Sequence, residues 1–180
     1  MKILVTGFPK YADQELNPSE SILPRINRDD VLTLLLPVEY DGARELLRQT
    51  IEKENPDAII VLALSPFVAR PILETYGYNE MDTTQPDEAG VIKHKEPIVK
   101  NGPASLPASY DLFSIQQYVL SQGEKVDISI DPGRFVANAV FYEALHSKKP
   151  SLMLHLPKES KYSLDDTLET LNRILDYIDY

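Results

Sequence analysis

The stretch that decides the fold is the most apolar one in the chain, Asp57-Ala58-Ile59-Ile60-Val61-Leu62-Ala63-Leu64. Eight residues are short for a helix, and a continuous apolar run indicates a strand buried on both faces of a sheet. It directly follows residues 41–54, in which Leu46, Leu47 and Ile51 lie on one face at helical spacing. A helix leading into a buried strand predicts a β-α-β unit, with a site in the loop beyond the strand's carboxyl end.

The rest of the chain continues this alternation of strands and helices. Short aliphatic runs predict strands at residues 2–6, 31–36, 126–130 and 152–154. Helical spacing predicts helices at residues 110–120, 135–145 and 164–180, and Asn17-Pro18 is typical of the start of a short helix. We therefore expect one domain spanning residues 1–180, an α/β/α sandwich with a mostly parallel twisted sheet.

Residues 65–106 interrupt the alternation. They contain five prolines and show neither the period of a strand nor that of a helix, which predicts loops and irregular strands. Forty residues without a period are too many for a simple connection inside a compact domain. We interpret this segment as a functional flap.

The composition excludes several classes of protein. The chain has 28 acidic and 18 basic residues, a formal charge of −10, so nucleic acid and anionic membrane surfaces are not expected partners. The apolar run near Met1 is too short for a signal peptide or a membrane span, and we expect a cytoplasmic protein. Zinc-peptidase, serine-hydrolase and nucleotide-binding motifs are missing, and we expect no metal and no cofactor.

Cysteine is also absent, which rules out a disulfide, a thiolate metal ligand and a cysteine nucleophile. This absence matters because of a resemblance that extends over nearly the whole chain.

Collinear segments resemble pyroglutamyl peptidase I, the pyrrolidone-carboxylate peptidase family of cysteine peptidases (family C15). No single segment is decisive, and their order and spacing carry the resemblance. The segments near the amino terminus are Gly7-Phe8 and Asn17-Pro18-Ser19. Those in the flap are Leu73-Glu74, Asn79, Pro86-Asp87, Gly90, Glu96-Pro97-Ile98-Val99, Asn101-Gly102-Pro103 and Leu106-Pro107. The last ones are Gly133, Val136, Asn138, Tyr142 and Met153-Leu154-His155-Leu156-Pro157.

The resemblance implies the removal of an amino-terminal pyroglutamate by a thiolate, which a histidine activates and a glutamate orients. By position, Glu74 corresponds to the orienting acid and His155 to the base. The position of the nucleophile holds Ala137, and a methyl group cannot attack a carbonyl. The chain is thus identified as a divergent member that lacks the catalytic cysteine.

A single engineered replacement of cysteine by alanine does not explain the other departures from the family pattern. The family's Gln-Ala-Gly-Gly-Arg-like loop is Leu64-Ser65-Pro66-Phe67-Val68 here, an expected arginine is Thr84, and a small Thr-Ala pair is Asp131-Pro132. These three departures together with Ala137 favour natural loss of the thiol function.

For the ligand pocket, the resemblance points to Phe8, Tyr11 and Phe67, which would hold a flat five-membered ring; the alternative interpretation is core and loop packing. His155 is equally explained as a hydrogen-bonded core histidine. We expect a protein without thiol peptidase activity that binds a small molecule or a peptide N-terminus and, as the family implies, forms a homo-oligomer.

Two alternatives stay open. One is an active pyroglutamyl-peptide hydrolase, either a cysteine-to-alanine variant or an enzyme with another nucleophile, such as Ser65, Ser129 or a water held by Asp131. The other is a structural or assembly protein.

Overall fold

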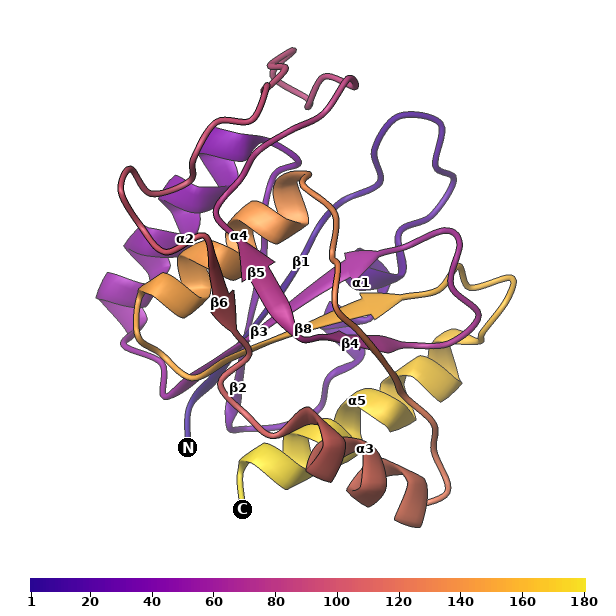
Figure 1. Cartoon of the computed structure of the whole chain (residues 1–180). Coiled ribbons are helices and arrows are strands. Elements are labelled where there is room, and N and C mark those ends of the chain that lie inside the picture. Colours follow the sequence, from indigo (N-terminus) through magenta and orange to yellow (C-terminus); the bar gives the residue numbers. More distant parts are fainter.

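The computed structural model describes all 180 residues, and a six-stranded sheet forms its centre (Figure 1). The strands lie in the order β2-β1-β3-β8-β4-β7. All neighbours pair in parallel except β4 and β8, which are antiparallel. The strands are β1 (Ile3–Gly7), β2 (Val31–Leu35), β3 (Ala58–Leu64), β4 (Ile72–Glu74), β7 (Asp127–Ser129) and β8 (Ser151–Leu156). The predicted mostly parallel sheet is confirmed.

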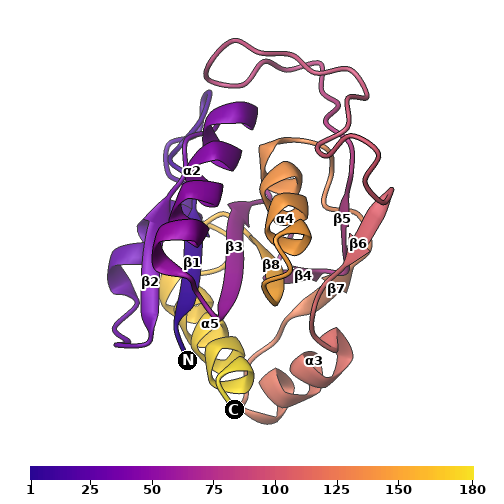
Figure 2. The same ribbon diagram turned by 90° about the vertical axis from the view of Figure 1, so that its left-hand side faces the viewer.

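Helices cover both faces of the sheet, as Figure 2 shows. On one face lie α2 (Tyr40–Glu54) and α4 (Val136–His146), and on the other α3 (Leu112–Ser121) and α5 (Leu164–Ile178). Side chains of β3 alternate between the two cores: Ile59, Val61 and Ala63 face α2 and α4, while Ala58, Ile60 and Leu62 face α3 and α5. This alternation explains why residues 57–64 are apolar throughout, and it confirms the α/β/α sandwich.

The loop after β1 packs against the first helix, α1 (Pro18–Ser21), which a 3₁₀ turn (Leu23–Arg25) follows. The Asn17 side chain caps α1 by accepting a hydrogen bond from the Ser19 N–H at 3.0 Å, as the sequence predicts. Ser19 Oγ in turn accepts a hydrogen bond from the Phe8 N–H at 3.0 Å. These contacts fix the position of Phe8 at the carboxyl end of β1.

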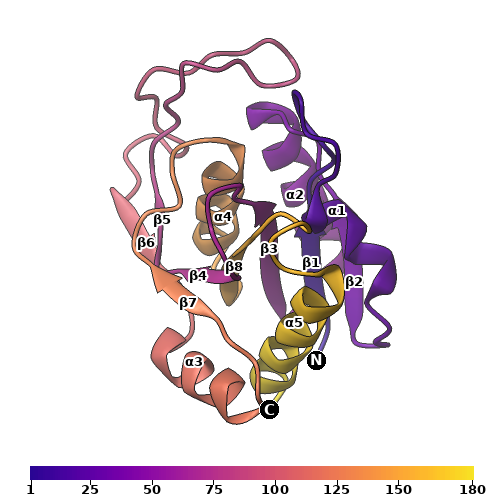
Figure 3. The ribbon, with the colours of Figure 1, turned by 90° about the vertical axis from the view of Figure 1, so that its right-hand side faces the viewer.

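The flap of residues 65–106 contains more strand than its sequence suggests. β4 joins the main sheet, and β5 (Tyr76–Tyr78) pairs with β6 (Ser105–Pro107) in a separate antiparallel ribbon. The remaining residues, 79–104, form a long loop that rises over the ends of α2 and α4 (Figures 2 and 3). Buried Asp87 anchors this loop, because its carboxylate accepts N–H bonds from Tyr40 at the start of α2 and from Ala89 and Val91.

The two ends of the chain lie at the same end of the molecule (Figure 1). The Met1 amino group is 3.6 Å from the Asp179 carboxylate. None of the helices combines the length and the apolar character needed to cross a bilayer.

Candidate functional site

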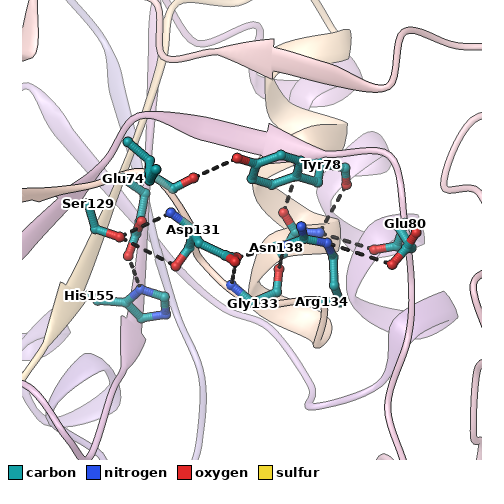
Figure 4. A network of polar contacts seen from close by, with 10 residues as sticks. Glu74, Tyr78, Glu80, Ser129, Asp131, Gly133, Arg134, Asn138 and His155 are labelled. Carbon is teal, nitrogen blue, oxygen red and sulfur yellow. Dashed lines mark hydrogen bonds and ion pairs between the residues drawn. The ribbon is translucent and has the colours of Figure 1, made fainter.

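A carboxylate and a histidine meet on the neighbouring strands β4 and β8 (Figure 4). A 2.7 Å hydrogen bond joins His155 Nδ1 to Glu74 Oε1. The side chain of Glu74 is 3% exposed and that of His155 is 12% exposed. When Glu74 is a carboxylate it can only accept, so Nδ1 carries a proton and Nε2 is the nitrogen free to face a ligand.

The strand pairing fixes the direction of both side chains. His155 lies opposite Ala63 of β3 and Ile72 of β4, and Glu74 comes two residues after Ile72. Residues paired across neighbouring strands, and residues two apart on one strand, point to the same face of a sheet. Ala63 belongs to the core beneath α2 and α4, so Glu74 and His155 also face this layer.

The same layer contains an apolar pocket of about 80 Å³ at the amino-terminal end of α4. Ala137 lines this pocket, and so does Ala63, the β3 residue that pairs with His155 of β8. Glu74 and His155 themselves do not line the pocket. The lining residues are Phe8, Tyr11, Gln14, Asn17, Val38, Ala63, Leu64, Phe135, Val136 and Ala137.

Aromatic rings form much of this wall. The Phe135 ring lies 5.7 Å from that of Tyr11 and 5.6 Å from that of Tyr40, measured between ring centres. Burial raises the pKa of Tyr11, and the nearby carboxylates of Asp87 and Glu88 raise it further. The Tyr11 hydroxyl donates to the carbonyl oxygen of Pro86, which ties the loop after β1 to the flap.

Helix α4 presents an uncapped end to the pocket. Its N-cap residue is Phe135, whose side chain makes no capping hydrogen bond. The N–H groups of the first turn of any helix lack an intrahelical acceptor and carry the positive end of the helix dipole, and no side chain of the N-cap residue accepts from them here. A carbonyl or oxyanion of a ligand at Ala137 would meet a favourable field.

The loop before α4 is held by its own polar contacts (Figure 4). Asp131 Oδ1 accepts a hydrogen bond from the Gly133 N–H at 2.9 Å and another from Arg134 at 2.7 Å. The Gly133 N–H, with a smaller contribution from Arg134, holds the pKa of Asp131 below its usual value. Ser129 Oγ accepts a hydrogen bond from the Asp131 N–H at 3.1 Å. Asp131 and Ser129 thus interact within this loop, and neither makes a hydrogen bond to Glu74 or His155.

Phe67 lies away from the pocket formed by Phe8 and Tyr11. Phe67 is 91% exposed and lines a second, wider cleft of about 570 Å³. The structure therefore brings two of the three predicted pocket aromatics together. It also places Glu74, Ala137 and His155 in one layer of the molecule, on β4, at the start of α4 and on β8 respectively.

Two further residues of the resemblance connect α4 to the flap. The buried Asn138 side chain donates to the carbonyl oxygens of Tyr78 and Glu80 at 3.0 and 3.2 Å, and accepts from the Tyr78 N–H at 2.9 Å. The Tyr142 hydroxyl donates to the Pro103 carbonyl oxygen at 2.7 Å. These contacts position the helix that carries Ala137.

Phe135 and Val38 are pocket residues that the sequence does not reveal. In the sequence, Phe135 has the spacing of the apolar face of a helix, and Val38 follows the end of a predicted strand. Neither pattern distinguishes a pocket residue from a core residue. The one feature of the sequence that could have indicated Phe135 is its position two residues before Ala137.

In this α/β/α sandwich, an acid–histidine pair and an apolar pocket at a helix start lie in one layer, and a base oriented by an acid is the arrangement found in nucleophilic hydrolases. The pyroglutamyl peptidase model (Peptidase_C15) matches residues 1–158. The chain belongs to the pyroglutamyl peptidase family, as a member that contains no cysteine.

Curated relatives agree with this assignment. The chain is 32% identical to the pyrrolidone-carboxylate peptidase of Thermococcus kodakarensis, over 98% of this chain and 93% of that protein. It is 30% identical to the pyrrolidone-carboxylate peptidase of Pyrococcus furiosus, over 87% of this chain and 81% of that protein.

Solved structures share the fold. Pyrrolidone carboxyl peptidase from P. furiosus, whose cysteine-free mutant was also solved, matches with a TM-score of 0.90 and 28% identity, over 98% of this chain and 97% of that one. The pyrrolidone carboxyl peptidase of Fervidobacterium islandicum matches with a TM-score of 0.92 and 24% identity, over 99% of this chain and 98% of that one.

Proposed function

We propose that this chain binds the amino-terminal pyroglutamyl residue of a peptide without cleaving it by thiol chemistry. The observation that carries the proposal is Ala137, which lines the pocket at the start of α4 in a chain that has no cysteine. The relatives are named as peptidases, and in that family a thiolate must attack the acyl carbon. A methyl group has no lone pair to donate.

The remaining parts of the site are suited to binding. A lactam ring is flat and uncharged, and the rings of Phe8, Tyr11 and Phe135 offer it apolar surface. The first-turn N–H groups of α4 can donate to a ligand carbonyl next to Ala137. His155 Nε2 can accept from or donate to the ligand, while Glu74 holds the imidazole in place.

Binding and cleavage are separated by one experiment on pyroglutamyl-alanine amide. Calorimetry measures binding, and mass spectrometry of the same sample measures released pyroglutamate. We expect saturable binding with no product, and thermal stabilisation by about 2.7 kcal/mol at a hundredfold excess over Kd. Prolyl-alanine amide is the control, because it has a five-membered ring but a charged amine and no lactam carbonyl.

Two results would overturn the proposal. Catalytic release of pyroglutamate would show an active hydrolase with another nucleophile. Equal affinity for the pyroglutamyl and prolyl peptides would show that the pocket does not recognise a lactam.

A further inference from the structure

We propose that the bound peptide carries lysine or arginine directly after its pyroglutamyl residue, and that these cationic side chains lie in the cleft beside the pocket. This inference rests on the proposed function. The cleft has a volume of about 570 Å³ and lies between three loops, residues 13–16, 64–67 and 158–160.

The cleft adjoins the pocket, because the two share lining residues. Gln14 and Leu64 line both, at the carboxyl end of β3. The pocket of about 80 Å³ is large enough for little more than a small ring, so the rest of a peptide must leave it. The neighbouring cleft, seven times larger, is where the following residues can lie.

One wall of the cleft is apolar and exposed. Phe67 is 91% exposed and Leu16 is 60% exposed, and both line the cleft together with Pro66. An aromatic face attracts a guanidinium or ammonium group, and the aliphatic stems of arginine and lysine pack on apolar surface. A ligand that covers Phe67 when it binds would explain why this side chain is so exposed in the free protein.

The charge of the cleft selects the same kind of side chain. Asp13, Glu15 and Glu159 line it against one cation, Lys158. None of these four takes part in an ion pair within the protein. The excess of carboxylates complements a cationic peptide and repels an acidic one.

The cleft is partly built before any ligand arrives. Lys161 Nζ donates to the Pro66 carbonyl oxygen at 2.9 Å, which joins the turn that carries Phe67 to the loop after β8. Gln14 Oε1 accepts a hydrogen bond from the Tyr11 N–H at 3.0 Å, which folds the loop that contains residues 13–16 back on itself. Because these loops are already held in place, the entropic cost of ordering them when a peptide binds is smaller.

The test compares three peptides by calorimetry at low salt: pyroglutamyl-arginyl-alanine amide and its counterparts with alanine or glutamate as second residue. We expect the arginine peptide to bind about fivefold to tenfold more tightly than the alanine peptide, the glutamate peptide more weakly than either, and the arginine preference to shrink in 0.5 M salt.

Two triple variants localise the effect. Asp13→Asn, Glu15→Gln and Glu159→Gln together should abolish the arginine preference while the alanine peptide binds as before. The control variant combines Asp29→Asn, Glu52→Gln and Glu169→Gln, which lie at exposed positions outside the cleft. It changes the net charge by the same amount as the first variant and should keep the preference for the arginine peptide.

Each contrary outcome has its own meaning. If the arginine and alanine peptides bind equally well to the unmodified protein, the cleft inference is wrong and the proposed function stands. If no pyroglutamyl peptide binds, both are wrong. If the second triple variant loses the preference for arginine as much as the first, the net charge of the protein causes the preference and the cleft does not.

Discussion

Glu74 and His155 are 81 residues apart in sequence and are joined by a 2.7 Å hydrogen bond between the neighbouring strands β4 and β8. The pair persists in a chain that has no thiol for the histidine to activate. Glu74 is 3% exposed, and its second oxygen, Oε2, has no hydrogen-bond partner. A buried carboxylate with a single partner depends strongly on that partner, so the pair contributes to the structure of the site whether or not it performs catalysis.

This dependence predicts non-additive stability effects. We expect His155→Ala to lower the free energy of unfolding by about 2–4 kcal/mol, because it leaves Glu74 buried and unpartnered. Glu74→Ala combined with His155→Ala should cost less than the sum of the single variants, by about 1 kcal/mol or more. Urea denaturation of the four proteins at neutral pH measures this coupling. Additive losses would show that the hydrogen bond contributes nothing to folding.

Restoring a thiol tests how much of the peptidase site remains. We expect Ala137→Cys to hydrolyse a fluorogenic pyroglutamyl amide, since a thiol at the start of α4 has a lowered pKa and faces the layer that contains His155. Adding His155→Ala should then lower the rate at least about 100-fold.

Ala137→Ser is the matched control, and we expect no turnover from it because a hydroxyl is a much weaker nucleophile than a thiolate. The expectation is wrong if Ala137→Cys binds pyroglutamyl-alanine amide normally and yet releases no product. In that case the replaced loop around Pro66 has removed the alignment that catalysis needs.

Most of the fold was predictable, because the hydrophobic period of a long segment indicates whether it forms a helix or a strand. The strand predicted at residues 57–64 is Ala58–Leu64, and the helix predicted at residues 41–54 is Tyr40–Glu54. The antiparallel pairing of β4 with β8 was not predictable. β4 has only three residues, too few for a period, and its place in the sheet depends on pairing with a strand about eighty residues away.

The site was predictable only in part. The resemblance named Glu74, Ala137 and His155. The strand register places Glu74 and His155 in the layer whose pocket Ala137 lines. The pocket wall combines side chains from loops, a strand and a helix start, and no local pattern shows that Phe135 joins Phe8 while Phe67 faces another cleft. Such placement depends on tertiary packing of distant segments.

An ion pair near the amino end of β2 predicts a pH dependence of stability. Two hydrogen bonds from Arg28, each 2.9 Å, hold the pKa of Asp30 below its usual value of about 3.9. The stabilisation is therefore complete above about pH 4 and is lost as the pH falls through the lowered pKa. We expect Asp30→Asn to lower the free energy of unfolding by about 1 kcal/mol at pH 7 and to have little effect near pH 2.

Urea titrations across this pH range measure the difference, and the exposed neighbour Asp29 provides the control. Asp29→Asn should be neutral at every pH. A loss for Asp30→Asn that is the same at pH 7 and pH 2 would mean that packing, and not charge, explains it.

The contact between Gly7 and Ser19 explains why a Gly-Phe loop accompanies an Asn-Pro-Ser helix start. A Cβ atom added at Gly7 would lie 2.1 Å from the Ser19 carbonyl oxygen, which belongs to the backbone and cannot rotate away. We expect Gly7→Ala to lower the free energy of unfolding by about 3 kcal/mol and, because Phe8 is displaced with it, to weaken binding of pyroglutamyl-alanine amide.

Gly42→Ala is the matched control within α2. There the added Cβ would meet the flexible end of the Glu39 side chain, which can move, and alanine favours the helix over glycine by about 1 kcal/mol. We expect equal or greater stability and unchanged binding. If Gly7→Ala proves as harmless as Gly42→Ala, the loop after β1 can shift away from α1, and the close approach is not what positions Phe8 in the pocket.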